Sequence, residues 1–227
     1  MQELRIKIPK TKLSFSVFGI LKYLFRKPES EIIINDSSVS FGKSYMMNSE
    51  IDSVAYGSHV VTVNLLARFA HYRICLKDRQ GQKILIKFHN IGLSFLYTKK
   101  KEETFQQLVM GLWHFILNKR MQEMLRDLNR GTPVTLGPCT LDLYGLDLEY
   151  RGVLLRKKRE RIEWNDLQHS VNNGLLLVTS LADSKVRSLI SLMRTDNAVL
   201  LNAMLDHIKS QMAKKHFTPG GKIPEFT

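Results

Sequence analysis

The feature that most constrains the fold is a repeated plan, in which short alternating segments lead twice into an amphipathic helix. Apolar residues at i, i+3, i+4 and i+7 predict a helix over residues 102–129. Its first stripe comprises Phe105, Leu108, Val109, Leu112 and Ile116, and a slightly rotated second stripe comprises Leu117, Met121, Met124, Leu125 and Leu128. Arg130 and Gly131 follow as a basic last turn and a glycine stop, which are typical of a helix C-terminus.

The same pattern returns near the C-terminus of the chain. Thr195 or Asp196 is expected to cap a second helix. Its apolar face comprises Ala198, Leu201, Met204, Leu205, Ile208 and Met212. Because an amphipathic helix buries one face, we expect each helix to cover the open side of a small curled sheet.

Turn residues between apolar runs predict antiparallel hairpins before each helix. Gly57 is expected to separate a strand over residues 51–56 from the β-branched run 60–66. The predicted hairpins join residues 32–34 to 39–41 and residues 72–76 to 84–88, and a tight turn over 172–174 precedes a strand over 175–179.

A joint at Thr132 and Pro133 divides the chain into two halves with low identity but a similar order of segments. We predict a first domain over residues 1–131, which includes an apolar and basic segment at 13–27. A second domain is predicted over residues 132–213. The remainder, 214–227, contains two prolines and two adjacent glycines and is predicted to be a flexible tail.

The strongest compositional signal is the net charge of +13 over 227 residues. Such a charge predicts attraction to lipid headgroups, to nucleic acid or to an acidic protein. The competing interpretation is that the charge only keeps the protein soluble.

The N-terminal segment combines aromatic and aliphatic side chains with flanking basic residues. It is too short to span a bilayer, and a lysine interrupts it. One interpretation is an interfacial segment that lies in the headgroup layer of a membrane. The other is a segment folded onto the first core. The candidate membrane contacts are Lys10, Lys12, Phe15, Phe18, Lys22, Phe25, Arg26 and Lys27.

A second basic run is predicted to lie at a hairpin of the second domain, and it is the best candidate anion-binding site. Its members are Arg156, Lys157, Lys158, Arg159 and Arg161. Each Lys or Arg near an anionic membrane contributes about 1 kcal/mol, so five together would matter. Charged hairpins also protect sheet edges from aggregation, which is the structural alternative.

No catalytic motif accompanies these basic residues. The sequence has no glycine-rich phosphate loop, no His-Glu-x-x-His and no paired cysteines with metal spacing. We therefore predict a protein that is not an enzyme and needs no cofactor or metal. Cys75 and Cys139 are the only cysteines, which favours a reducing cytoplasm over a disulfide-stabilised exterior.

The second half resembles the bacterial pleckstrin-homology-like (PH-like) domains. The resemblance rests on a glycine-led strand at residues 152–155, a basic turn, and the stretch Arg-Ile-Glu-Trp-Asn-Asp-Leu at 161–167. It covers roughly residues 133–212. A weaker match covers 31–129, which lacks the corresponding tryptophan and has a helix longer than the family usually shows.

The resemblance implies an α+β fold with two PH-like domains, each a strongly bent antiparallel sheet plugged by a C-terminal helix. Domains of this fold bind lipids or proteins, so fold alone does not decide function. Our hypothesis is a non-catalytic binding module that associates peripherally with anionic lipids at the inner face of the cytoplasmic membrane. The alternative is a protein-interaction or scaffold domain that forms homo-oligomers or binds an acidic partner. Nucleic acid is a third, less favoured partner.

Overall fold

The computed structural model describes residues 3–8, 31–63, 67–93, 99–151 and 156–225. The protein is an α+β chain whose sheets are all antiparallel, as the sequence predicts. It forms two compact units, Met1–Ile116 and Leu117–Thr227. Each unit is described by itself below.

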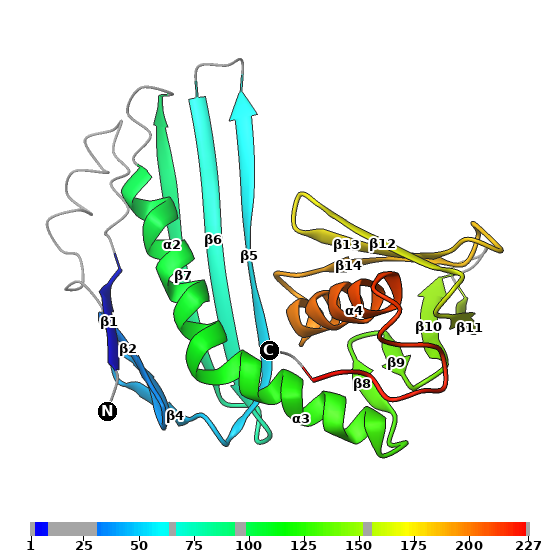
Figure 1. Cartoon of the computed structure of the whole chain (residues 1–227). Helices are drawn as coiled ribbons and strands as arrows, with labels where there is room; N and C mark the ends of the chain where they lie inside the picture. Colours follow the sequence, from blue (N-terminus) through cyan, green and yellow to red (C-terminus); the bar gives the residue numbers. More distant parts are fainter. Residues whose placement is uncertain (1–2, 9–30, 64–66, 94–98, 152–155, 226–227) are drawn as a thin grey trace, which may run out of the picture. The chain divides into compact units, whose positions relative to one another are not determined.

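Unit 1 contains two antiparallel sheets followed by a helix (Figure 1). The first sheet is β1 (Glu3–Lys7), β2 (Glu31–Asn35), β3 (Ser38–Phe41) and β4 (Ser44–Met47), in that order. The second is β5 (Ile51–Val63), β6 (Ala67–Asp78) and β7 (Lys83–Leu93). The predicted hairpins β2–β3 and β6–β7 are confirmed by their registers. Asn35 stabilises the first turn by accepting hydrogen bonds from the backbone N–H groups of Ser37 and Ser38.

The prediction that Gly57 breaks a strand is wrong. β5 runs through it, with Gly57 opposite Arg73 and every later residue to Val63 still paired with β6. The cost of a glycine inside a strand is roughly 0.5–1 kcal/mol, and continuous pairing with β6 on a three-stranded sheet outweighs it.

Helix α2 (Lys99–Leu112) covers one face of the second sheet of unit 1. Phe105 contacts the rings of Tyr56, Tyr72 and Phe88, one from each strand. Just beyond the helix, Trp113 donates a hydrogen bond from Nε1 to the Tyr56 hydroxyl at 2.7 Å. These contacts define the helix-covered face of the sheet.

The single α-helix predicted over residues 102–129 is interrupted. A π-helical turn, η1 (Trp113–Leu117), separates α2 from α3 (Asn118–Asn129). A π turn holds extra residues and therefore shifts the phase of the apolar stripe, which explains the rotated second stripe in the sequence. The division between the two compact units, after Ile116, lies inside this turn.

Unit 2 repeats the order of four strands, three strands and a helix (Figure 1). The four-stranded sheet is β8 (Val134–Leu136), β9 (Cys139–Leu141), β10 (Gly145–Arg151) and β11 (Lys157–Glu163). The three-stranded sheet is β12 (Leu167–Asn172), β13 (Leu175–Ser180) and β14 (Arg187–Ser191). Helix α4 (Ala198–Ala213) buries seven apolar residues, and its first turn, Ala198 to Leu201, is buried on all sides. Trp164 is fully buried in this unit.

The N-cap of α4 lies one residue after Asp196 and two residues after Thr195, the two residues predicted to cap it. The N-cap is Asn197 in a left-handed conformation with φ 58°, and no side chain caps the helix. Asparagine tolerates this conformation better than most residues because its short polar side chain fits there.

The C-terminal segment, which the sequence predicts to be flexible, instead packs on unit 2 over its described residues. Phe217 and Ile223 are buried. The Asn129 side chain donates to the Ile223 carbonyl at 2.8 Å and accepts from the Ile223 N–H at 2.7 Å. His207 Nε2 lies 2.7 Å from the Pro224 carbonyl oxygen. The prediction rested on the glycines and prolines of this segment. Burial of Phe217 and Ile223 stabilises the packed segment in spite of them.

Candidate functional site

The basic run predicted to bind anions lies on strand β11 rather than in a turn. Lys157, Lys158, Arg159 and Arg161 belong to the strand, and Arg156 immediately precedes it. β11 pairs with β10, so that Arg161, Arg159 and Lys157 lie opposite Asp147, Glu149 and Arg151. The two strands therefore bring acidic residues onto the same surface as the basic ones.

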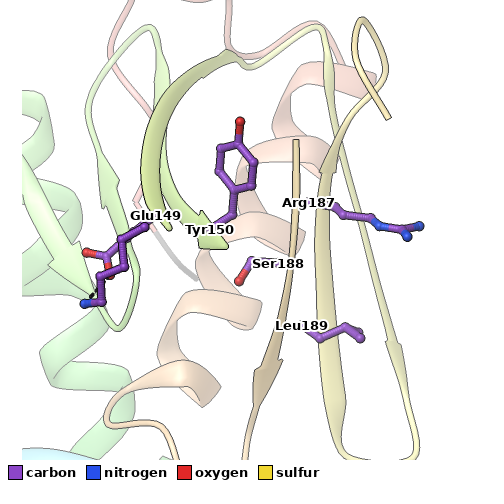
Figure 2. Close-up of a pocket in the computed structure, with 6 residues that line it drawn as sticks. Glu149, Tyr150, Arg187, Ser188 and Leu189 are labelled. Carbon is purple, nitrogen blue, oxygen red and sulfur yellow. Dashed lines mark ion pairs between the residues drawn. The ribbon is translucent and has the colours of Figure 1, made fainter. Parts of the chain in front are cut away.

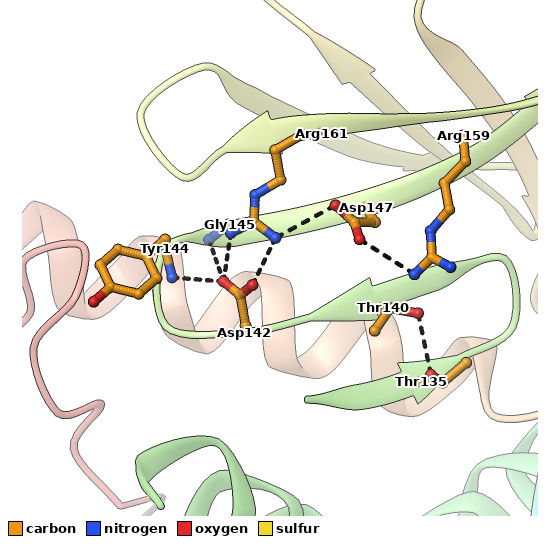
Figure 3. A network of polar contacts seen from close by, with 8 residues as sticks. All are labelled: Thr135, Thr140, Asp142, Tyr144, Gly145, Asp147, Arg159 and Arg161. Carbon is orange, nitrogen blue, oxygen red and sulfur yellow. Dashed lines mark hydrogen bonds and ion pairs between the residues drawn. The ribbon is translucent and has the colours of Figure 1, made fainter. Parts of the chain in front are cut away.

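Three members of the basic run form ion pairs with acidic residues of unit 2, and Figure 3 shows those of Arg159 and Arg161. Lys157 Nζ lies 2.6 Å from Glu149, and Arg159 lies 3.2 Å from Asp147. Arg161 contacts both Asp142 and Asp147. Much of the positive charge on this surface is therefore balanced within unit 2.

Asp142 holds this network to the β9–β10 turn. It accepts hydrogen bonds from the backbone N–H groups of Tyr144 and Gly145, at 2.8 and 3.1 Å, as well as from Arg161. Partial burial acts to raise the pKa of Asp142, but the Arg161 and backbone hydrogen bonds outweigh it and hold the pKa below its usual value.

Arg156 and Lys158 have no ion pair among the described residues. Lys158 is exposed and lies opposite Tyr150, whose hydroxyl donates to Glu160 at 2.7 Å. Two of the five predicted residues are thus available to an external anion.

A larger set of basic residues lies in unit 1, on the face of β5–β7 opposite the helix-covered face. We call it the basic face. It comprises His59 on β5, His71, Arg73 and Lys77 on β6, and Lys83, Lys87 and His89 on β7.

The basic face places like charges directly opposite one another. Lys77 pairs with Lys83 and Arg73 with Lys87, and the titratable residues His71 and His89 are opposed in the same way. His59 continues the histidine row on the other side of His71. Like charges in such cross-strand positions destabilise a sheet, so an external anion on this face would relieve repulsion.

The pKa values of His71 and His89 on the basic face reflect burial and the neighbouring positive charges. Burial, followed by the charges of His89, Lys87, Arg73 and His59, lowers the pKa of His71. Burial and then Lys101 and Lys87 lower the pKa of His89. The Arg73 Nε atom is buried and has no hydrogen-bond partner within the described part of the chain. The lowered pKa values favour neutral histidines, so the positive charge of the basic face comes from its Lys and Arg side chains.

Exposed apolar side chains lie at the end of the same sheet. Val61 and Phe69 face each other across β5 and β6, two positions beyond the histidine row and on the same face. They are 42% and 41% exposed, and the neighbouring Val60 is 43% exposed. We call these three residues the apolar tip.

The other predicted membrane contacts, from Lys10 to Lys27, lie outside the described residues. No helix in the described ranges is long and apolar enough to cross a bilayer. In the same ranges, no group of three or more His, Cys, Asp or Glu side chains is arranged to hold a metal ion.

Sequence reasoning missed the basic face, although the signal was present. The predicted hairpin that joins residues 72–76 to 84–88 has a register that places Lys77, Arg73 and His71 opposite Lys83, Lys87 and His89. The basic run at 156–161 stood out because its residues are consecutive, whereas the basic face alternates with core residues along each strand.

Comparisons with protein-family models, with curated proteins and with solved structures find no match to this chain.

Proposed function

We propose that this protein is a non-catalytic binding module that associates with an anionic membrane surface through the basic face of unit 1. The observation that carries the proposal is the alignment of Lys77–Lys83 and Arg73–Lys87 as opposed like-charged pairs on one face, with His71 and His89 opposed beside them. The proposed place of action is the inner face of the cytoplasmic membrane, where anionic lipids give a negative surface potential.

The dimensions of the basic face suit a surface better than a single small ligand. From residue 71 to residue 77 a strand rises roughly 20 Å, at about 3.3 Å per residue. Four Lys or Arg side chains on this area would each contribute about 1 kcal/mol near an anionic bilayer. The histidines add charge as the pH falls.

The apolar tip supports a membrane over other polyanions. Val60, Val61 and Phe69 extend the sheet beyond the basic rows, so apolar side chains would enter the interface while the cations contact headgroups. Binding of single-stranded nucleic acid would favour several aromatic rings among the cations. Phe69 is the one Phe, Tyr or Trp at the register positions of this face in the described residues.

The hairpin β10–β11 was the anion-binding site predicted from the sequence. In this proposal it contributes less to membrane binding than the basic face does. Its Lys157, Arg159 and Arg161 are already paired with acidic residues. Arg156 and Lys158 remain as secondary contacts.

The PH-like fold of both units is part of the same proposal. Its support is the repeated order of a four-stranded sheet, a three-stranded sheet and a helix, seen in β1–β7 with α2 and in β8–β14 with α4. The acidic-protein and homo-oligomer alternatives remain predictions.

Co-sedimentation of the full chain with vesicles tests the proposal. Vesicles of phosphatidylcholine alone are compared with vesicles of phosphatidylcholine and phosphatidylserine, which give the negative surface potential that attracts polybasic segments, at low and moderate salt. Binding is expected only to the anionic vesicles and should weaken with salt. The double variant Lys83→Glu, Lys87→Glu should reduce the partition coefficient at least about tenfold.

The matched control is Arg156→Glu, Lys158→Glu, which makes the same charge change on the other unit. It should reduce binding much less. If this control abolishes binding while the β7 variant does not, the basic face is the wrong site. If the protein binds neither kind of vesicle, the membrane proposal is wrong. It is also wrong if the protein binds a DNA duplex more tightly than anionic vesicles at the same salt concentration.

A further inference from the structure

The longest strand of the described residues, β5, lies at an edge of its sheet. It has 13 residues, whereas the average strand in proteins has about 5–6. Among the described strands it pairs with β6 on one side and with none on the other (Figure 1). A long edge of this kind presents a row of backbone N–H and C=O groups that can pair with another chain.

The register identifies which residues of β5 carry the outward groups. The Asp78 N–H donates to the Gln82 carbonyl, so the even-numbered residues of β6 exchange hydrogen bonds with β7. The odd-numbered residues of β6 therefore bond to β5, where they lie opposite the odd-numbered residues of 53–63. The even-numbered residues of β5 point their backbone groups away from β6. We call four of them the open edge: Tyr56, Ser58, Val60 and Thr62.

The open edge lacks the features by which edge strands usually avoid pairing. Charged side chains, proline, bulges and short length are the common protections. Residues 53–63 include no Asp, Glu, Lys, Arg or Pro, although the chain carries a net charge of +13. The one register shift of the β5–β6 pair, between Ile51 and Ser53, lies outside the open edge.

The other edges of the described sheets are protected. β1, β7 and β11 carry Lys or Arg along their length. β4 and β8 have only four and three residues, and β12 has six. The edge of β14 borders a pocket of about 430 Å³ that Glu149, Lys157 and Arg187 help to line (Figure 2). Among the described edges, β5 is therefore the one that is both long and without Lys, Arg, Asp or Glu beyond its second residue.

We propose that the open edge is a dimer interface, at which β5 pairs antiparallel with β5 of a second copy of this chain. A two-fold contact presents the same residues from both copies. A chain of high positive charge can therefore pair with itself only where its surface carries no cations, and the open edge meets this condition. The two three-stranded sheets would become one sheet of six strands. This inference goes beyond membrane binding and does not depend on it.

A two-fold axis at His59 uses the whole open edge. Tyr56 then pairs with Thr62 of the second copy, and Ser58 with its Val60, so all the outward backbone groups are hydrogen-bonded. Tyr56 and Thr62 form an aromatic–β-branched pair, which stabilises antiparallel sheets. Gly57 lies opposite Val61 of the second copy. Glycine inside a strand often marks a close approach of another backbone, which gives a reason for its place in β5.

The same axis keeps the cations of the two basic faces apart. Arg73 and Lys87 lie in one row with Gly57. Across the interface this row continues into Val61 and Phe69 of the second copy, which are apolar. His59 lies opposite its own counterpart, where one neutral imidazole can donate to the other. Repulsion between Lys or Arg side chains therefore does not oppose the pairing.

Sedimentation velocity of the full chain over a range of concentrations, in reducing buffer at mildly alkaline pH and without lipid, tests the proposal. A monomer–dimer equilibrium is expected. Val60→Pro should raise the dimer dissociation constant at least about tenfold, because proline removes an outward N–H and is tolerated at a strand edge. Phe69→Ser is the control, since it makes the apolar tip more polar on β6 and leaves the open edge intact. It should leave the dissociation constant nearly unchanged.

Cysteine substitution tests the register. Residues opposite each other in a non-hydrogen-bonded pair have Cα atoms about 4.5 Å apart, which is within the range of a disulfide. Mild oxidation should therefore link His59→Cys into a covalent dimer. Val61→Cys is the matched control, because the two copies of this residue lie roughly 13 Å apart along the strands. The native Cys75 and Cys139 are buried and should not contribute.

Circular dichroism identifies variants that keep the native fold. The proposal is overturned if the chain stays monomeric at every concentration, or if folded Val60→Pro dimerises as tightly as the native chain. A dimer that Phe69→Ser abolishes and Val60→Pro does not would point to apolar association instead. Linkage of Val61→Cys as efficient as that of His59→Cys would also overturn the pairing. Since no vesicles are present, these outcomes are separate from the membrane test.

Discussion

The Nδ1 atoms of His71 and His89 lie 3.1 Å apart on neighbouring strands, with their rings stacked at 4.5 Å and an angle of 28°. One of the two nitrogens must carry a proton and donate it to the other. A proton on the accepting nitrogen would turn two N–H groups toward each other and add a positive charge beside Arg73 and Lys87. This pair therefore links the charge of the basic face to pH.

Stability of unit 1 is expected to fall as the pH falls below about 6.5. Both histidines have a pKa below 6.5 in the folded chain, so the unfolded chain binds protons first. The stabilisation is fully present above 6.5 and is lost as the pH passes through the folded pKa values. Thermal unfolding of the full chain between pH 5 and 7.5 measures this.

The variant His71→Asn, His89→Asn should flatten that pH dependence. His216→Asn is the control, because His216 is exposed and outside the sheet, and it should leave the slope as it was. An equal slope in all three proteins would show that other groups cause it.

Asp142→Ala should destabilise unit 2 by about 1–3 kcal/mol, because two backbone N–H groups and Arg161 lose their acceptor. Asp142→Asn should cost less, since its amide oxygen still accepts from Tyr144 and Gly145. Urea unfolding measures both. Asp127→Ala removes only an exposed pair with Arg130 at 3.9 Å and should change stability little. A cost as large as that of Asp142→Ala would contradict the role given to the turn.

Packing of the C-terminal segment predicts that Ile223→Ala costs about 2–4 kcal/mol, as for other buried aliphatic residues. Asn129→Ala should also destabilise, through the loss of both hydrogen bonds to Ile223. Glu225→Ala is the comparison, because its pair with Arg126 is exposed and 3.6 Å long. Protease digestion should release the segment faster from the first two variants, and equal rates in all three would argue against docking.

Cys139 should resist alkylation in the folded protein. Burial raises the pKa of its thiol to about 12, so almost no thiolate is present at pH 8. Mass spectrometry after N-ethylmaleimide treatment should find Cys139 unmodified until guanidinium is added. Rapid modification of the native chain would show that β9 opens readily.

Local patterns determined much of the secondary structure. Turn residues such as Asn35 and Asp78 predicted the hairpins, because their side chains hydrogen-bond their own turns. The helix end at Asn129 was also readable, because Gly131 adopts φ 83°, which glycine accepts without strain.

Tertiary structure decided what depends on contacts between distant residues. Gly57 stays in a strand because β6 pairs with it, and the C-terminal segment docks because Asn129, 94 positions earlier, binds Ile223. The charge balance of the basic run could not be read from residues 156–161 alone. Only the β10–β11 register brings Glu149, Asp147 and Asp142 to Lys157, Arg159 and Arg161. The sequence shows which charged residues are present, and the tertiary structure determines which of them form ion pairs.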